Sequence, residues 1–348
     1  MKRFILCGFI GLTFVSFSQN DSIVKAKVIS ENQGYELSYN EGVKKFQAND
    51  FEGALKDLNE SIRLKADVER THFYKGVSLF NLNDFANALV SLNQAIQLQP
   101  TADAYFYKGQ VNEKLGKNDV AFEEYNNSLK INATYYQSRY YKGVLLYVKN
   151  ELEAAKNCFD SVITVNPTFA YAYNDRASVK LALNDVDGAI KDYSQAITLA
   201  PEMSIIYNNL GSAKRKKGDF TGAINAYNQA IEKKADYAIA YNNRGATRID
   251  KGDFKGAIAD FDKAIELKKD YVFAYNNRAG AKNKLKDFKG GIEDCNKAIA
   301  LDANNGMAYL NRGILHENML NMKNACEDWI RAKSLGIEQA KSFLEYCH

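Results

Sequence analysis

The chain has 348 residues, of which 46% are hydrophobic and 25% charged, a composition ordinary for a folded protein. Its formal net charge is only +4 and the charges are interspersed, so the sequence predicts neither a nucleic-acid partner nor attraction to acidic lipid. After the first 18 residues no apolar run approaches the ~20 residues that a membrane span requires, so we expect no span in the mature chain.

Residues 1–18 have the features of a secretory signal peptide. Lys2 and Arg3 precede an apolar run from Phe4 to Phe17, and the predicted cleavage site lies before Gln19. The alternative is a membrane anchor, but the run is shorter than a span requires. We therefore expect an exported protein, periplasmic or secreted. The polar residues 19–34 are weakly patterned and are predicted to form a linker.

From residue 35 onward the sequence repeats with a period of 34 residues. Residues 238–271 and 272–305 match almost position for position, and the period extends in both directions with a single 33-residue step. Small residues recur at the 20th and 27th places, and the 24th place is large in all repeats but one. The three prolines all fall at the 32nd place, where each ends a helix. The 8th place is also small throughout: Gly42, Gly76, Gly109, Gly143, Ala177, Gly211, Gly245, Ala279 and Gly313.

This pattern resembles the tetratricopeptide repeat, a helix-turn-helix unit of 34 residues. The resemblance implies an all-α fold, a right-handed α-solenoid (superhelix) of antiparallel helix pairs whose first helices line a concave face. One pair cannot bury its apolar face alone, so stability comes from neighbours stacking in a line. We predict nine repeats, at residues 35–68, 69–101, 102–135, 136–169, 170–203, 204–237, 238–271, 272–305 and 306–339, and a C-terminal capping helix at 337–348.

Four repeats carry an arginine at the 7th place, and the same four carry an aspartate at the 23rd. In the sixth repeat both are replaced, by Leu210 and Ala226. This matched exchange predicts that the two places face each other, so that each arginine forms a structural ion pair with its own acid. The alternative is an anion-binding row of arginines. The predicted pairs are Arg176–Asp192, Arg244–Asp260, Arg278–Asp294 and Arg312–Asp328.

Cysteine and histidine placement bears on disulfides and metals. An exported chain meets oxidising conditions, and we predict that Cys326 and Cys347 bond and hold the capping helix on the last repeat. The alternative is two buried free thiols. No cysteine pair has metal-ligand spacing and the three histidines lie far apart in sequence, so we predict no metal site.

The expected concave groove is aromatic at one end and rich in amides at the other. An amide side chain offers both a donor and an acceptor, which match those of a peptide backbone. The resemblance implies that asparagines at the 6th place can grip an extended peptide; the alternative is that they bond to the neighbouring repeat. The candidate groove residues are Phe73, Phe106, Tyr140, Asn208, Asn209, Asn242, Asn243, Asn276, Asn277 and Asn311.

The sequence offers little support for catalysis. It contains no glycine-rich phosphate loop, no nucleophile elbow and no histidine beside a candidate nucleophile. We therefore predict no enzyme, no cofactor and no small-molecule substrate, but a scaffold that binds a peptide or partner segment in its concave groove. Two alternatives remain: an assembly component of an envelope complex acting through its convex face or ends, and a carbohydrate-binding protein that uses the groove aromatics.

Overall fold

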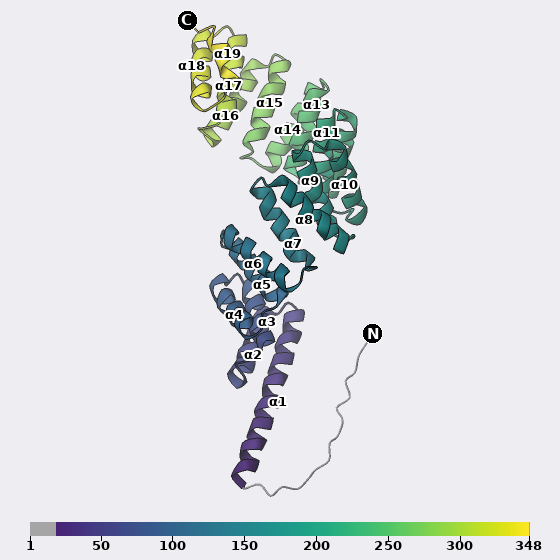
Figure 1. Cartoon of the computed structure of the whole chain (residues 1–348). Helices are drawn as coiled ribbons and strands as arrows, with labels where there is room; N and C mark the ends of the chain where they lie inside the picture. The colour runs from purple at the N-terminus through teal and green to yellow at the C-terminus, as the bar shows by residue number, and fades with distance from the viewer. Residues whose placement is uncertain (1–18, 348) are drawn as a thin grey trace. The chain divides into compact units, whose positions relative to one another are not determined.

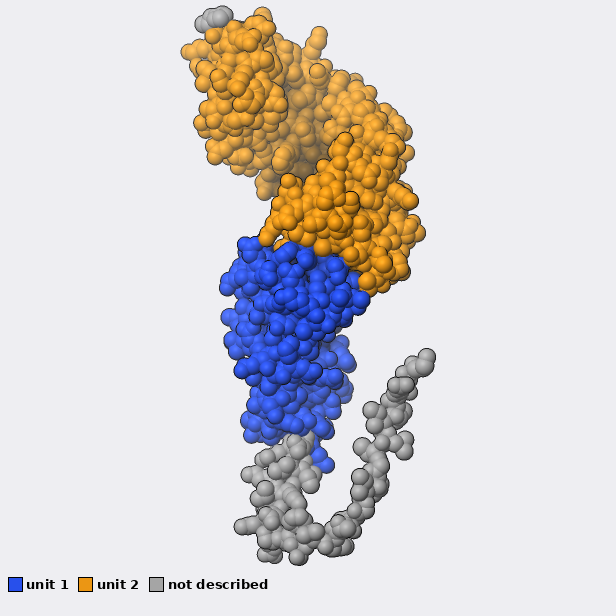
Figure 2. Space-filling view, in the orientation of Figure 1, with its two compact units in different colours: residues 1–142 blue, residues 143–348 orange. Residues whose placement is uncertain are grey.

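The structure is a computed structural model that describes the backbone of residues 19–347 and the side chains of residues 33–347. The predicted signal peptide and His348 lie outside the described residues. The described residues form helices and turns, with no β-strand among them (Figure 1). They divide into two compact units, unit 1 up to Lys142 and unit 2 from Gly143 (Figure 2).

Unit 1 is a stack of paired helices. The first helix of each pair packs against the second, and the second packs against the first helix of the next pair. The helix that contains the unit boundary is α7 (Tyr136–Val148). The others are α1 (Gln19–Gln47), α2 (Phe51–Leu64), α3 (Glu69–Asn81), α4 (Phe85–Leu98), α5 (Ala102–Lys114) and α6 (Asn118–Ile131).

Unit 2 continues the same arrangement of antiparallel pairs and ends in a short helix. Each pair from α9 onward falls inside one predicted 34-residue repeat. The helices are α8 (Leu152–Val165), α9 (Ala170–Ala182), α10 (Val186–Leu199), α11 (Ser204–Lys217), α12 (Phe220–Lys233), α13 (Ala238–Asp250), α14 (Phe254–Leu267), α15 (Val272–Lys284), α16 (Phe288–Leu301), α17 (Gly306–Asn318), α18 (Met322–Ser334) and α19 (Ala340–Leu344).

The turn inside each pair has a recurring backbone conformation. Where α13 meets α14, Gly252 adopts a positive φ of 80°, and the Asp253 carboxylate caps α14 by accepting from the Gly256 N–H at 2.9 Å. The same 15th place has positive φ in all nine repeats, mostly at asparagine or glycine, which tolerate it. These residues are Asn49, Asn83, Gly116, Asn150, Asn184, Gly218, Gly252, Lys286 and Leu320.

The small residue at the 8th place allows the two helices of a pair to approach. A Cβ added at Gly245 would lie 2.8 Å from Cε1 of Phe261, the fully buried 24th-place residue of the same repeat. At Gly211 the corresponding distance to Tyr227 is 2.6 Å. A side chain at either glycine would therefore displace the ring that fills the interface between the helices.

The predicted linker is wrong in one respect. The backbone of residues 19–34 is helical and continues directly into the first predicted repeat as the N-terminal part of α1. The segment contains no proline, so no residue in it lacks the N–H that a helix requires.

The C-terminal segment closes the stack. The ring of Phe343 on α19 stacks on Trp329 of α18 with ring centroids 5.0 Å apart, and Ala340 of α19 is fully buried. Cys326 and Cys347, the pair predicted from the sequence, are joined by a disulfide with their Cα atoms 5.7 Å apart. The cap is thus held by both packing and a covalent bond.

Candidate functional site

The predicted arginine–aspartate pairs form within repeats, as facing positions on the two helices. In the pair Arg244–Asp260, Nη2 donates to Oδ1 at 2.6 Å and Nε to Oδ2 at 3.0 Å, a bidentate geometry. The same two-point contact joins Arg176 to Asp192, Arg278 to Asp294 and Arg312 to Asp328.

A second contact of each arginine crosses to the preceding repeat, which the sequence did not predict. Nη1 of Arg176 donates to Oδ1 of Asp160 at 2.7 Å, and Nη1 of Arg244 donates to Oδ1 of Asn228 at the same distance. Burial alone would lower the pKa of Arg176, but its bonds to Asp192 and Asp160 outweigh that effect and raise the pKa. These cations are already neutralised inside the protein, so they stabilise the stack and offer no anion-binding row.

The 5th- and 6th-place asparagines form a row of their own, here called the amide row. Nδ2 of Asn243 donates to Oδ1 of Asn208 in the preceding repeat at 3.0 Å, and Nδ2 of Asn277 donates to Oδ1 of Asn242 at 2.9 Å. Asn209 bonds Asn174 in the same way at 3.1 Å. Asn208, Asn242 and Asn276, at the 5th place, are buried, whereas the 6th-place amides are half-buried.

The bond to the neighbouring repeat leaves other hydrogen-bonding groups of each 6th-place amide side chain available. An amide has two N–H donors and a carbonyl oxygen with two lone pairs. The inter-repeat bond uses one N–H, and the oxygens of Asn209 and Asn243 each accept one bond from the preceding asparagine, which leaves one N–H and one lone pair. The last member, Asn311, donates instead to the backbone carbonyl of Asn276 at 3.5 Å. The structural role and the peptide-binding role predicted for this row are therefore compatible.

Two hollows open beside the amide row in unit 2. The larger has a volume of about 570 Å³ and the smaller about 350 Å³, and Lys216 lines both. Each contains a serine at the 9th place that shares a hydrogen bond with the 24th-place tyrosine hydroxyl, Ser212 with Tyr227 at 3.2 Å and Ser178 with Tyr193 at 2.9 Å. The surface that carries the two hollows and the amide row is called the groove of unit 2 below. Figure 2 shows that the surface of this unit, drawn in orange, is hollowed.

Small 9th-place residues are the reason for this space. The 9th place is Ser178, Ser212, Ala246 and Gly280 in four consecutive repeats, and a Cβ added at Gly280 would meet no atom within 4 Å. Burial raises the pKa of Tyr193 to about 12, so its hydroxyl keeps its proton at neutral pH. The hydroxyl and amide groups of the groove are therefore neutral.

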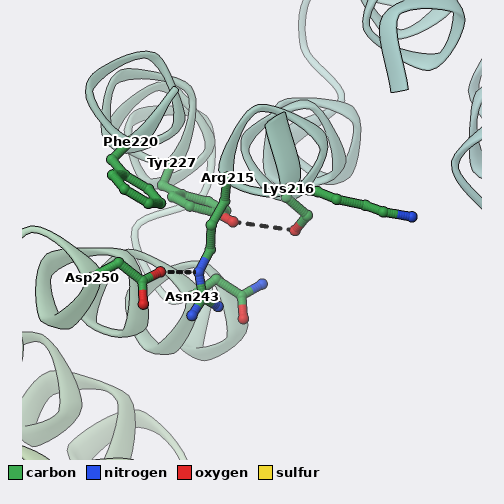
Figure 3. Close-up of a pocket in the computed structure, with 7 residues that line it drawn as sticks. Arg215, Lys216, Phe220, Tyr227, Asn243 and Asp250 are labelled. Carbon is green, nitrogen blue, oxygen red and sulfur yellow. Dashed lines mark hydrogen bonds and ion pairs between the residues drawn. The ribbon is translucent and has the colours of Figure 1, made fainter. Parts of the chain in front are cut away.

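The larger hollow also contains charged groups (Figure 3). Nε of Arg215 donates to Oδ2 of Asp250 at 2.6 Å, and Asn243 lies beside this pair. Lys216 extends away from them, and its Nζ donates to the carbonyl oxygen of Leu181 at 2.9 Å. Both cations therefore have partners within the chain.

The aromatic candidates in unit 1 do not form an open groove. Phe106 is only 9% exposed and packs against Tyr107 and Tyr141, so the structure corrects its predicted place on the binding surface. Phe73 lines a hollow of about 240 Å³ but also packs edge-on against Tyr107. Tyr140 is half-buried and packs edge-on against Tyr141. These rings pack against one another because bulky residues at neighbouring places fill the space between repeats, so little of their surface is open to a partner.

Comparison with known proteins assigns the family. Tetratricopeptide repeat profiles match residues 39–102, 73–136, 138–204, 238–271 and 274–305, and a further profile described as TPR repeat matches 211–248. The chain belongs to the tetratricopeptide repeat family. A TPR repeat-containing protein of Methanocaldococcus jannaschii is 26% identical over 133 residues, which are 38% of this chain and 23% of that protein. The chain thus matches less than a quarter of this relative's length.

Solved structures agree in fold. A tetratricopeptide repeat protein from Parabacteroides merdae is 17% identical with a TM-score of 0.58, covering 70% of this chain and 97% of that one. The APC/C hetero-tetramer Cut9–Hcn1 gives 15% identity and a TM-score of 0.59, covering 89% and 75%. Within the described residues of the present chain, no helix is long and apolar enough to cross a membrane.

Proposed function

We propose that this chain is a non-enzymatic scaffold that binds an extended segment of a partner protein in the groove of unit 2. The tetratricopeptide fold generally mediates protein–protein interactions, and the groove combines an open hollow with half-buried amides that keep spare hydrogen-bonding groups. The observation that carries the proposal is the amide row beside the two hollows. An extended backbone has a donor and an acceptor at nearly every residue, and 6th-place amides retain both.

A selected peptide tests this proposal. Peptides are selected on the purified chain from a random display library, and the dissociation constant of the best one is measured by fluorescence polarisation. The double variant Asn243→Ala/Asn277→Ala removes two amides of the row and is expected to weaken binding by about tenfold or more. The matched control, Asn225→Ala/Gln229→Ala, removes two exposed amides from α12 and should leave binding unchanged.

Thermal unfolding separates a lost contact from a lost fold. Each amide removed from the row also loses one inter-repeat hydrogen bond, which costs about 1 kcal/mol. A small fall in Tm with a large fall in affinity supports the groove. If the amide variant binds the selected peptide as wild type does, the binding surface lies elsewhere and the proposal is wrong.

We further propose that the protein is exported. Residues 1–18 have the composition of a signal peptide, and the Cys326–Cys347 disulfide is consistent with an oxidising compartment. Fractionation of cells that express the full chain should place it outside the cytoplasm with Gln19 as its N-terminal residue. Deletion of residues 2–18 should retain it in the cytoplasm, and recovery of full-length chain with Met1 outside the cytoplasm would contradict cleavage.

A further inference from the structure

Five consecutive repeats of unit 2 expose a large apolar side chain at the same place. The exposed fraction runs from 43% for Met307 to 68% for Phe273. In unit 1 the corresponding place is polar, with Arg70, Asp103 and Gln137. The exposed residues, called the apolar stripe below, are Tyr171, Ile205, Ile239, Phe273 and Met307.

The apolar stripe follows the stack of first helices. Each member is the second residue of its helix, on α9, α11, α13, α15 and α17, and each of these helices contacts the next. Scattered exposed apolar residues need no explanation, but a row that recurs at one position in five neighbours marks an interaction surface.

The apolar stripe runs beside the amide row. The 2nd and 6th places of a helix are four residues apart, so Ile239 and Asn243 lie on one face of α13, one turn from each other. The same holds for Phe273 and Asn277 on α15. Each repeat from the sixth to the ninth therefore offers an apolar contact and, one turn away, an amide, and neither carries a charge; in the fifth repeat the 6th place is Asp175.

We propose that the apolar stripe and the amide row together dock an extended partner segment that carries an uncharged apolar side chain at every third residue. This inference rests on the proposed function and names the class of ligand for the same groove. The apolar stripe receives the side chains, and the amide row bonds the backbone between them. A helical ligand satisfies its backbone groups internally and would leave the amides unused, which favours an extended chain.

The three-residue spacing comes from the spacing of the repeats. Packed helices lie about 8–10 Å apart, and the amide bonds of 2.9–3.1 Å between neighbouring first helices show that these helices are packed. Three residues of a polyproline II chain advance about 9.3 Å, whereas two residues of a β-strand advance only about 6.6 Å. Only the three-residue spacing keeps successive apolar side chains in step with successive repeats.

Peptides of defined spacing provide the test. Four fluorescein-labelled peptides of roughly 15 residues, enough to span the apolar stripe, share a neutral polar background. Three of them carry leucine at every second, every third or every seventh residue, the last in a helix-favouring background, and the fourth has none. We expect the every-third peptide to bind at least tenfold more tightly than each of the others.

Variants locate the binding on the surface. The variant Ile239→Glu/Phe273→Glu should lower the affinity for the peptide with leucine at every third residue at least tenfold. Its Tm should not fall, because both side chains are already exposed. The control Ile330→Glu changes an exposed apolar residue on α18, outside the apolar stripe, and should have no effect.

Three outcomes would overturn the inference: tighter binding of the seven-spaced helical peptide, no binding of any peptide up to about 1 mM, or unchanged binding by the glutamate variant. A chain that dimerises through the apolar stripe, with the dimer lost in the glutamate variant, would assign the surface to a second copy instead. If the Asn243→Ala/Asn277→Ala variant no longer binds the library-selected peptide but the glutamate variant still binds it, the groove function stands and only the apolar-stripe inference fails.

Discussion

Asp260 is the residue whose removal best tests whether the arginine–aspartate pairs hold the repeats together. Its side chain is only 4% exposed and accepts hydrogen bonds from Arg244 at two points and from Nη1 of Arg248 at 2.6 Å. Replacing it with alanine removes the buried acid that both arginines share, although Arg248 keeps Asp253, with its Nε 3.7 Å from Oδ2. Breaking a buried ion pair by removing one partner costs roughly 3–5 kcal/mol. Both arginines keep a partner, in Asn228 and the Gly256 carbonyl, so we expect the lower end, about 3 kcal/mol.

Asp262, two residues further along α14, is a matched control. It also bonds an arginine, with Nη1 of Arg278 donating to its Oδ1 at 2.6 Å, but its side chain is 55% exposed. Exposed pairs contribute about 0–1 kcal/mol because water screens them. Asp262→Ala should therefore be nearly neutral. The free energy of unfolding of both variants is measured by urea denaturation followed by circular dichroism.

The sixth repeat suggests a double substitution that should restore the stability lost in Asp260→Ala. It has Leu210 and Ala226 in place of the pair, and both are buried. Arg244→Leu/Asp260→Ala copies this arrangement and should recover most of the lost stability, since well-packed apolar residues often replace a buried ion pair without loss. If Asp260→Ala costs no more than Asp262→Ala, or lowers the affinity for a groove peptide at unchanged stability, the structural assignment is wrong.

Three further substitutions or treatments have clear expected results. Gly245→Ala forces a Cβ against a buried ring and should lower the free energy of unfolding by about 1–3 kcal/mol in urea denaturation; a neutral change would contradict the close approach. Leu320→Gly relieves a positive φ of 60° at an exposed turn and should raise stability by about 1 kcal/mol, measured in the same assay, where any loss would count against strain. Reducing Cys326–Cys347, which closes a 21-residue separation, should cost about 3 kcal/mol and speed amide exchange in α19; unchanged exchange would show that packing alone holds the cap.

The sequence by itself determined the repeating fold. A small residue at the 8th place and a large one at the 24th fit together only where two helices are in close contact. The repeat pattern therefore predicts that Gly245 lies against Phe261. The matched exchange of Arg and Asp for Leu and Ala predicted which places face each other within a repeat. Such information is local, because both partners lie within one 34-residue unit and recur with it.

Only the tertiary structure decided which polar and aromatic residues remain available to a partner. The bond from Arg244 to Asn228 joins different repeats, whereas the exchange of Arg and Asp predicted only the pairing within a repeat. Phe106 and Phe273 both lie on first helices, at the 5th and 2nd places of their repeats, and only the structure shows that the first is buried among rings and the second is exposed. Exposure depends on what neighbouring repeats place around a side chain, and those neighbours lie about 34 residues away in the sequence. The periodicity therefore fixes how the chain folds, while the packing between repeats fixes which surface is left to bind.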